Sequence, residues 1–437
     1  MTEIYTEAFK NRSDITSVAI GENVKYIYDY AFCNCPNITS IVIPKNVYEI
    51  DNYAFANCSG LLSVTFAYKS SLTIIGQGAF SGCSALSSID IPEGVTSIDI
   101  IAFDGCSELS DITIPESVVS IGSSAFRNCS SLPVENDIRY ADSYLVEAVD
   151  KTKSSYTLKE GIRFIGNSAF NGSVINSFVI PEGVISIGDY AFGSCTKLTS
   201  VTIPESMRTI GESAFRYSDK LTKAEFASIE SLLKISFYDA SSNPLNVAKH
   251  LYVNGEEVTD IVIPDNITSI RRYALYNCLS IKSVTLHEGV TSIGESAFYG
   301  CSNIKSITCM AESAPTIKSS SFSSLYSTAV LYVPVSSQNT YKTATHWQNF
   351  SFILTLEDKE AGIVIKGSCG DDVNFVLSID SVMNINGTGQ MTQMSINPWS
   401  YFREGIKSIV ISDGVTSICN NAFLIATMLF LLRFRTA

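Results

Sequence analysis

One pair of residues recurs along almost the whole chain. An isoleucine stands five positions before a phenylalanine, or once a leucine, in thirteen places. The pairs are Ile4 and Phe9, Ile27 and Phe32, Ile50 and Phe55, Ile75 and Phe80, Ile98 and Phe103, Ile121 and Phe126, Ile165 and Phe170, Ile187 and Phe192, Ile210 and Phe215, Ile270 and Leu275, Ile293 and Phe298, Ile317 and Phe322, and Ile418 and Phe423. The first six pairs follow one another at steps of 23, 23, 25, 23 and 23 residues, and steps of 22 to 24 recur further along the chain. A fixed period of this length predicts a solenoid, in which each repeat forms one rung.

Each repeat has the pattern of two short extended segments. In residues 198–215, LTSVTIPESMRTIGESAF, Val201 and Ile203 alternate with hydroxyl side chains, which predicts a strand with one buried face. Pro204 ends this strand because it cannot donate to a continuing ladder. The later Thr-Ile-Gly predicts a second short strand or extended segment, and residues 212–217 predict a single helical or 3-10 turn. The chain is therefore expected to be a β-rich solenoid of about 23-residue repeats with short helical or 3-10 turns.

Three segments interrupt the period, and we expect a structural role for each. Residues 133–159 predict a hairpin-like excursion, and residues 226–257 predict a helical turn followed by a strand pair. Residues 310–352 drift from the repeat pattern and end near Trp347, as an end cap would. Functional loops also favour such positions, so that alternative stays open.

The character of the chain changes near residue 355. Residues 356–400 predict a small β-hairpin module with its turn at Asn386-Gly387. Residues 401–437 predict the start of a second repeat array, which breaks off after Phe423 in LIATMLFLLRFRTA. We expect a truncated or frameshifted end there, with a short membrane-associating tail as the alternative. The solenoid itself is assigned to residues 1–355.

Charge and hydropathy exclude several classes of protein. The chain has 43 acidic and 30 basic residues and a net charge of −13, which repels nucleic-acid phosphates. The longest apolar run is shorter than the roughly 20 residues that a membrane-spanning helix needs, so no transmembrane span is expected. The start, MTEIYTEAFKNRSD, lacks the basic and apolar segments of a signal peptide. Either the protein stays in the cytoplasm or this chain lacks its true beginning.

The full motif, L-x-S-V-x-I-P-x-x-V-x-S-I-G-x-x-A-F-x-x-C, closely resembles the BspA-like, or Treponema-type, leucine-rich repeat family. The resemblance covers residues 1 to about 352 and resumes at 400. It implies a right-handed solenoid and a role in adhesion or host interaction, usually as a secreted or cell-surface bacterial protein. From this resemblance we expect an extracellular or cell-surface location.

The sequence contains no pattern typical of catalysis, cofactor binding or metal binding. Eight cysteines share one column, three residues after the closing Phe or Leu, and we interpret them as small buried residues with a weak S–H donor. They are Cys35, Cys58, Cys83, Cys106, Cys129, Cys195, Cys278 and Cys301. A disulfide chain or a metal ladder is the alternative for such a column. We expect no cofactor, no metal and no catalytic residues.

Two rows of residues are candidates for binding. The outward positions of the main strand form a candidate binding face: Val42, Thr65, Asp90, Thr113, Val179, Thr202, Glu225, Val262, Thr285 and Thr308. The turn after that strand forms a candidate acidic edge: Glu93, Glu116, Glu182, Glu205, Asp265 and Glu288. The acidic edge is interpreted either as a solvated row of turn residues or as a ridge for basic partners or Ca²⁺.

Three functions remain open at this point. The first is a non-enzymatic protein-interaction or adhesion module that binds a protein or glycan through the solenoid surface. The second is a passive stalk or spacer on the cell surface. The third, a carbohydrate-active enzyme, lacks a convergent set of acid, base and nucleophile. We expect a protein or glycan partner, no nucleic acid, and a monomer.

Overall fold

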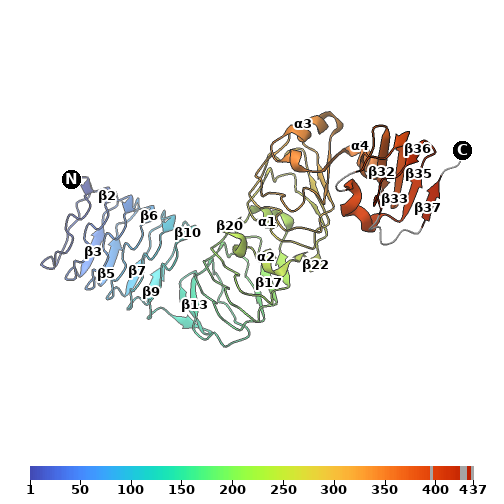
Figure 1. The fold of residues 1–437 in the computed structure, drawn as a ribbon. Helices are drawn as coiled ribbons and strands as arrows, with labels where there is room; N and C mark the ends of the chain where they lie inside the picture. Colours follow the sequence, from blue (N-terminus) through green and yellow to red (C-terminus); the bar gives the residue numbers. More distant parts are fainter. Residues whose placement is uncertain (394–396, 424–430, 435–437) are drawn as a thin grey trace. The chain divides into compact units, whose positions relative to one another are not determined.

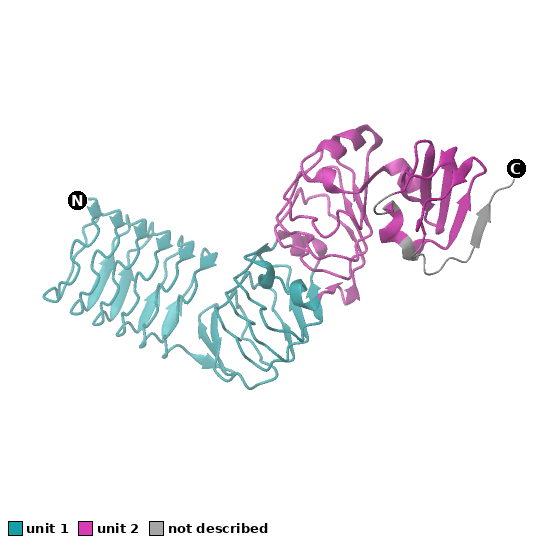
Figure 2. Cartoon of the chain, in the orientation of Figure 1, with its two compact units in different colours: residues 1–227, 235–248 teal, residues 228–234, 249–437 magenta. Residues whose placement is uncertain are grey.

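The computed structural model describes residues 1–393, 397–423 and 431–434. The chain divides into two compact units, shown in Figure 2. Unit 1 contains residues 1–227 and 235–248, and unit 2 contains residues 228–234 and 249–437. Both are built largely of β-solenoid rungs, which confirms the predicted fold class (Figure 1).

A complete rung contributes one main strand and one minor strand, each to its own parallel sheet. The main strand carries the Ser-Val-x-Ile pattern, and the minor strand carries the recurrent isoleucine. The minor strands of the first six rungs are β1 (Glu3–Ile4), β2 (Tyr26–Ile27), β4 (Glu49–Ile50), β6 (Ile74–Ile75), β8 (Ser97–Ile98) and β10 (Ser120–Ile121). Their main strands form the sheet β3 (Ser40–Ile43), β5 (Ser63–Phe66), β7 (Ser88–Asp90) and β9 (Asp111–Thr113). The register pairs each isoleucine with that of the next rung, for example Ile27 with Ile50.

A hairpin interrupts unit 1 within residues 133–159, as predicted. It consists of β11 (Val134–Glu135), β12 (Ile138–Ala141) and β13 (Tyr144–Ala148), which pair antiparallel. Strand β13 then pairs parallel with β14, so the hairpin occupies the position of one minor strand. The minor strands that follow are β14 (Phe164–Ile165), β16 (Ser186–Ile187), β18 (Thr209–Ile210) and β20 (Ser236–Phe237). The main strands are β15 (Ser177–Val179), β17 (Ser200–Ile203) and β19 (Lys223–Phe226).

The phenylalanines form a continuous stack inside the first rungs. The ring centroids of Phe80 and Phe103, and those of Phe103 and Phe126, are 5.5 Å apart with nearly parallel planes. All three rings are buried. At the hairpin the parallel stacking ends, and the Tyr144 ring lies 5.3 Å from Phe126 with its plane tilted by 59°. The isoleucines, leucines and cysteines of the repeat complete this core.

The segment around each phenylalanine, from two residues before it to the cysteine three residues after it, is called here the turn segment. In residues 30–35 the N–H groups of Tyr30, Phe32 and Asn34 donate to carbonyl oxygens of the next rung at 2.7–2.9 Å. The intervening N–H groups, those of Ala31 and Cys33, donate to carbonyl oxygens three residues back in the same rung. Tyr30 and Asn34 have positive φ angles of 56° and 58°, which prevents a continuous helix. Each of the first five turn segments is joined to the next rung through three alternate N–H groups in this way.

The cysteine column completes the hydrogen bonding of the turn segments. The Cys58 thiol donates to the carbonyl oxygen of Phe32 in the preceding rung at 3.2 Å, and the Cys83 thiol donates to that of Phe55 at 3.2 Å. All twelve cysteines are free, and all except Cys419 are buried. The interpretation of the column as small buried residues with a weak donor is thus supported by geometry.

Residues 226–257 contain helical turns followed by a strand pair, as predicted, and they are shared between the two units. Unit 1 contains η1 (Ala240–Ser242) and α2 (Leu245–Ala248). Unit 2 contains α1 (Ile229–Lys234) and the antiparallel pair β21 (Leu251–Val253) and β22 (Glu256–Glu257).

The rungs of unit 2 repeat the arrangement of unit 1. Their strands are β23 (Asp260–Val262), β24 (Ser269–Ile270), β25 (Ser283–Leu286), β26 (Ser292–Ile293), β27 (Ser306–Cys309), β28 (Thr316–Ile317), β29 (Val330–Val333) and β30 (Phe352–Thr355). The segment predicted as an end cap contains η2 (Val335–Ser337), α3 (Gln338–Thr343) and η3 (Trp347–Asn349). Trp347 is buried, lies 5.5 Å from Phe322, and donates to the carbonyl oxygen of Pro315 at 2.7 Å. This indole therefore covers the phenylalanine column at that point.

The last part of unit 2 is a sheet of different topology. After α4 (Leu356–Glu360), the strands are β31 (Ile363–Ser368), β32 (Val373–Ser378), β33 (Val382–Gly387), β34 (Gly389–Gln390), β35 (Ser408–Ile411), β36 (Val415–Ser417) and β37 (Leu431–Phe434), with η4 (Pro398–Gly405) between β34 and β35. Strands β31 to β33 are antiparallel, whereas β33 and β35 are parallel. Strand β33 precedes the predicted boundary at residue 400 and β35 follows it, yet the two strands lie in one sheet. The predicted domain boundaries at 355 and 400 therefore stay a prediction.

The predicted turn at Asn386-Gly387 is wrong. The turn between β32 and β33 lies at residues 379–381, and Gly387 is the last residue of β33. Gly387 has a φ of 124°, and a Cβ there would lie 1.8 Å from the carbonyl oxygen of Asp372. The glycine is therefore needed for a close backbone approach at the strand end, not for the turn.

Most of the predicted truncated tail after Phe423 lies outside the described residues. Among the residues that are described, no helix combines the length and apolar character needed to cross a membrane.

Candidate functional site

The main strands present the predicted binding face as expected at nine of its ten positions. Val42, Val179 and Val262 are 57%, 69% and 69% exposed, values that are high for valine. Three further members are exposed and three are half-buried: Thr65, Asp90, Thr113, Thr202, Glu225 and Thr285. The alternation along each strand turns these side chains outward, because the intervening residues pack in the core.

The face is divided into three separate rows. The first row contains Val42, Thr65, Asp90 and Thr113 on β3, β5, β7 and β9. The second contains Val179, Thr202 and Glu225, which pair directly across β15, β17 and β19. The third contains Val262, Thr285 and Thr308 on β23, β25 and β27 of unit 2. The hairpin β12–β13 separates the first row from the second, so the sequence pattern overstated the continuity of the face.

Thr308 does not belong to an open face. Its side chain is only 3% exposed, and its hydroxyl accepts a 2.6 Å hydrogen bond from the Lys359 ammonium of α4. The strand alternation turned Thr308 outward as predicted, but α4 covers that position. Thr308 is therefore unavailable to a partner, and the prediction for this residue is corrected.

The six residues of the acidic edge are all exposed. The Glu182 carboxylate accepts from the N–H groups of Glu205 and Ser206 at 3.1 and 2.9 Å, so it caps the corresponding turn of the next rung. That contact favours a structural role at this position. Within the described part of the chain, no three His, Cys, Asp or Glu side chains come close enough together to hold a metal ion.

A groove lies in the first row of the binding face, where one repeat is two residues longer than its neighbours. The extra length forms a loop after β5, in which Tyr68 is 87% exposed and Lys69 has a φ of 56°. The loop and strands β5 and β7 enclose a hollow of 570 Å³. Thr65, Asp90 and Glu93 line it, so the hollow brings together members of both predicted sets.

The groove offers a mixed set of chemical groups. The Asp90 carboxylate accepts from the Thr113 hydroxyl at 2.8 Å, which fixes its position on the strand. Ser63 and Ser88, paired across β5 and β7, add hydroxyl groups beside it. The Tyr68 ring forms an apolar wall with a polar tip. The arrangement therefore suits hydrogen bonding and aromatic contact with a bound molecule.

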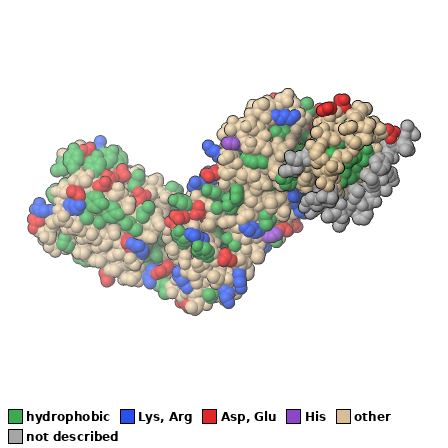
Figure 3. Space-filling model, viewed as in Figure 1, with side chains coloured by type: hydrophobic (Ala, Val, Ile, Leu, Met, Phe, Trp, Pro, Cys, Tyr) green, Lys and Arg blue, Asp and Glu red, His purple; other side chains and the backbone are tan. Residues whose placement is uncertain are grey.

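Sequence reasoning missed a cluster of tyrosines on the minor-strand side of the first rungs. Tyr5 and Tyr28 stack with centroids 6.0 Å apart, Tyr26 and Tyr28 stack at 5.8 Å, and Tyr48 lies 6.2 Å from Tyr26. Tyr5 and Tyr48 are exposed, and the other two are half-buried. Figure 3 shows side chains of its hydrophobic class, which includes tyrosine, beside acidic ones on the N-terminal part of unit 1. The run YIYDYAF at 26–32 was the available signal.

Acidic side chains accompany these tyrosines. Burial, together with the charges of Glu49 and Asp29, raises the pKa of Asp51 to about 7, and a hydrogen bond with Glu49 adds to the effect. Burial and the nearby carboxylates Glu3 and Asp51 also raise the pKa of Tyr28. Carboxylates therefore gather beside these tyrosines, and one of them titrates near neutral pH.

Comparison with known proteins agrees with the geometry. A family model described as the BspA type leucine rich repeat region matches residues 2–133, 163–251 and 245–353, in six copies. No curated protein matches the chain.

Several solved structures are similar to the chain. A leucine-rich repeat protein from Bacteroides ovatus is 24% identical, with 72% of this chain and 87% of that chain covered and a TM-score of 0.36. A leucine rich cell surface protein from Faecalibacterium prausnitzii is 27% identical, with 67% and 85% covered and a TM-score of 0.26. The T. pallidum leucine rich repeat protein is 21% identical, with 61% and 77% covered and a TM-score of 0.24.

The family model accounts for well over half of the residues, and the rungs it describes are those seen in the structure. The chain therefore belongs to the BspA-type leucine-rich repeat family.

Proposed function

We propose that the chain is a non-enzymatic protein-interaction or adhesion module that binds a protein or glycan on the first row of its main-strand face. The observation that carries this proposal is the 570 Å³ groove, where Thr65, Asp90 and the exposed Tyr68 lie together. Its volume is within the range of pockets that hold small ligands or the anchoring side chain of a partner.

The residue types in the groove suit recognition. A tyrosine gives a large contact area at a low cost in side-chain entropy, and serine and threonine hydroxyls both donate and accept hydrogen bonds. The strands below are held by in-register pairing and a buried core, so the face changes little on binding. A preorganised face of this kind lowers the entropic cost of association.

We further propose that the protein acts at the bacterial cell surface as a monomer. Membership in the BspA-type family supports this location, since such repeats resemble those of secreted and surface proteins.

The groove can be tested with a binding panel. Matrix proteins and glycans are immobilised, and saturable binding of the whole chain is measured by surface plasmon resonance. Tyr68→Ala combined with Asp90→Asn is expected to weaken binding of a captured ligand about tenfold or more, as for a central anchor of an interface. Tyr238→Ala is the matched control, because Tyr238 is also an exposed tyrosine of unit 1, at 58%.

The proposal fails if no ligand in the panel binds saturably. It also fails if the double variant binds as well as the native chain while circular dichroism shows that both remain folded.

A further inference from the structure

The turn segment of the sixth rung is hydrogen-bonded unlike those of the five rungs before it. In the preceding rung the N–H groups of Ile101, Phe103 and Gly105 donate to the next rung at 3.0, 2.8 and 2.8 Å. The equivalent donors of the sixth rung are the N–H groups of Ser124, Phe126 and Asn128, and no described residue accepts from any of them. Phe126 is buried, whereas Ser124 is half-buried and Asn128 is exposed, so the segment keeps three donors that another molecule can pair.

The chain supplies acceptors at other irregular points of the solenoid. At the rung of Phe215, the Asp239 carboxylate accepts from the Ser213 N–H, and the Ser241 carbonyl oxygen accepts from the Phe215 N–H. At the rung of Phe298, the hydroxyls of Ser320 and Ser324 and the carbonyl oxygen of Ser321 accept from the three donors. This replacement is incomplete, because no described residue accepts from the Tyr217 N–H or, beside the end cap, from the N–H groups of Ser320, Phe322 and Ser324.

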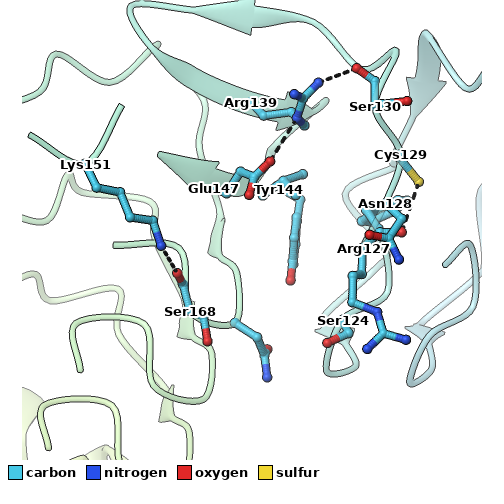
Figure 4. A pocket seen from close by; sticks show the side chains of 13 residues that line it. Ser124, Arg127, Asn128, Cys129, Ser130, Arg139, Tyr144, Glu147, Lys151 and Ser168 are labelled. Carbon is cyan, nitrogen blue, oxygen red and sulfur yellow. Dashed lines mark hydrogen bonds and ion pairs between the residues drawn. The ribbon is translucent and has the colours of Figure 1, made fainter. Parts of the chain in front are cut away.

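The hairpin explains the unpaired donors of the sixth rung. Strand β13 replaces a minor strand, and its Ala148 N–H donates to the Ala169 carbonyl oxygen at 2.8 Å, but no carbonyl oxygen of the hairpin accepts from Ser124, Phe126 or Asn128. A pocket of 440 Å³ lies in the place where the turn segment of a regular rung would run. Figure 4 shows Ser124, Arg127 and Asn128 on one side of it and Lys151 and Ser168 on the other.

The pocket is basic. Arg127, Arg139 and Lys151 line it, against a single carboxylate, that of Glu147, which pairs with Arg139. Lys151 donates to the carbonyl oxygen of Asn171 at 2.9 Å, the type of acceptor that a turn-segment N–H uses in a regular rung. The Arg127 side chain is 58% exposed and pairs with Asp104 outside the pocket lining. Both arginines are thus paired with a carboxylate, whereas no described carboxylate pairs with the Lys151 ammonium, and its positive charge favours an anionic ligand.

We propose that this pocket binds an acidic peptide segment of a partner protein, which supplies the missing acceptors. Carbonyl oxygens of alternate residues accept from the N–H groups of Ser124, Phe126 and Asn128, while an acidic side chain faces Arg127 and Lys151. The site is separate from the groove on β5 and β7, so neither proposal depends on the other.

The donor spacing favours a peptide over an acidic sugar. In the regular rungs the same three donors meet carbonyl oxygens of alternate residues in one polypeptide segment, such as residues 52, 54 and 56. A bound peptide reproduces that spacing with its own backbone, and the bonds form without further adjustment of the turn segment. This is recognition through main-chain hydrogen bonds, as in strand addition to a sheet edge.

The test uses the whole chain and a display library of random peptides. Selected peptides are expected to be enriched in Asp and Glu. Their affinities are measured by fluorescence polarisation, and hydrogen exchange read by mass spectrometry is expected to show new protection at residues 123–130. Residues 100–107 of the preceding rung, whose donors are already paired, are expected to show no change.

Two variants separate the pocket from the rest of the surface. Arg127→Gln is expected to weaken the selected peptides about tenfold, the effect of losing one charge-assisted hydrogen bond. Arg216→Gln is the matched control, because Arg216 also follows the phenylalanine of its rung and is exposed. It is expected to leave the affinity unchanged.

The proposal is overturned if no peptide is enriched, or if the enriched peptides bind Arg127→Gln normally and give no protection at 123–130. Peptides whose affinity falls only in the Tyr68→Ala and Asp90→Asn double variant would bind the groove. That result would support the proposed function and overturn the peptide site at residues 123–130. If oligogalacturonate or sialyllactose protects residues 123–130 and no peptide does, the ligand is an acidic glycan and the proposal of a peptide ligand is overturned.

Discussion

The Ser218 hydroxyl donates a 2.6 Å hydrogen bond to the carbonyl oxygen of Phe192. At other rungs a cysteine thiol makes this bond; the Cys106 thiol, for example, donates to the carbonyl oxygen of Phe80 at 3.2 Å. The column therefore selects a small side chain that donates a hydrogen bond to the preceding rung. Neither disulfide nor metal chemistry is needed to account for it.

Substitution at Cys106 tests this role. Cys106→Ser keeps the donor and is expected to change the free energy of unfolding by less than about 1 kcal/mol. Cys106→Ala leaves the Phe80 carbonyl oxygen without its donor and is expected to cost about 1–3 kcal/mol. Urea denaturation followed by circular dichroism measures both, and equal losses for the two variants would contradict the role.

Thiol reactivity follows from the same burial. Burial raises the pKa of Cys58 and of Cys129 to about 12, so neither forms a thiolate at neutral pH. Cys419 is the one cysteine that is not buried. An aromatic disulfide reagent is expected to label about one thiol per native chain and all twelve after denaturation. Cys419→Ser should abolish the native signal, and rapid labelling that survives this change would contradict the assignment.

The phenylalanine stack predicts graded losses of stability. Phe103 is fully buried between two rings, each 5.5 Å away. Phe103→Ala is expected to cost about 3–5 kcal/mol, because it removes the ring and leaves a cavity. Phe103→Leu is expected to cost about 1.5 kcal/mol or less, since Leu275 fills the same column in unit 2. Thermal melts of the two variants provide the comparison, and similar melting temperatures would contradict it.

Asp51 predicts a stability that depends on pH. Its pKa rises from 3.8 to about 7 on folding, so the folded chain holds a proton that the unfolded chain lacks between these values. The contribution of this carboxyl is complete below pH 3.8 and is lost as the pH rises through about 7. Asp51→Asn is expected to raise stability at pH 8 by about 1 kcal/mol, a figure reduced for solvent screening of a partly exposed group.

Melting temperatures of the native chain and Asp51→Asn at pH 5 and pH 8 provide the measurement. Glu22→Gln, an exposed carboxylate of the same unit, is the control. An Asp51→Asn effect that is equal at both pH values would show that the carboxyl does not titrate in this window.

The sequence was sufficient for the features that repeat. The two columns to which Ile27 and Phe32 belong identified buried positions, because the same residue types recur at them in thirteen repeats. The alternation around Val201 identified the strand and its outward residues. The longer repeat that ends at Phe80 was visible as a step of 25, although only the structure showed that the extra residues form a groove beside Asp90.

The features that do not repeat could not be read from the same pattern. Thr308 has the sequence context of an exposed position, but Lys359, 51 residues later, covers it. Asn386-Gly387 is a strong turn signal, yet here the glycine serves a close approach to Asp372. The unpaired donor of Phe126 has no sequence signature, because its cause is the absence of a segment that other rungs possess.

The exchange of three hydrogen bonds between successive turn segments also bears on how such chains vary in length. Each regular rung presents three donors to the next one and offers three carbonyl oxygens to the one before, as residues 29–35 do. A whole repeat can therefore be duplicated or deleted while both neighbours keep their partners. A fraction of a repeat cannot be inserted or deleted in this way, because the N–H donors of one rung would then lack carbonyl acceptors in the next. Arrays of this kind are expected to grow and shrink in complete rungs, and an inserted segment of any other length must bring its own acceptors.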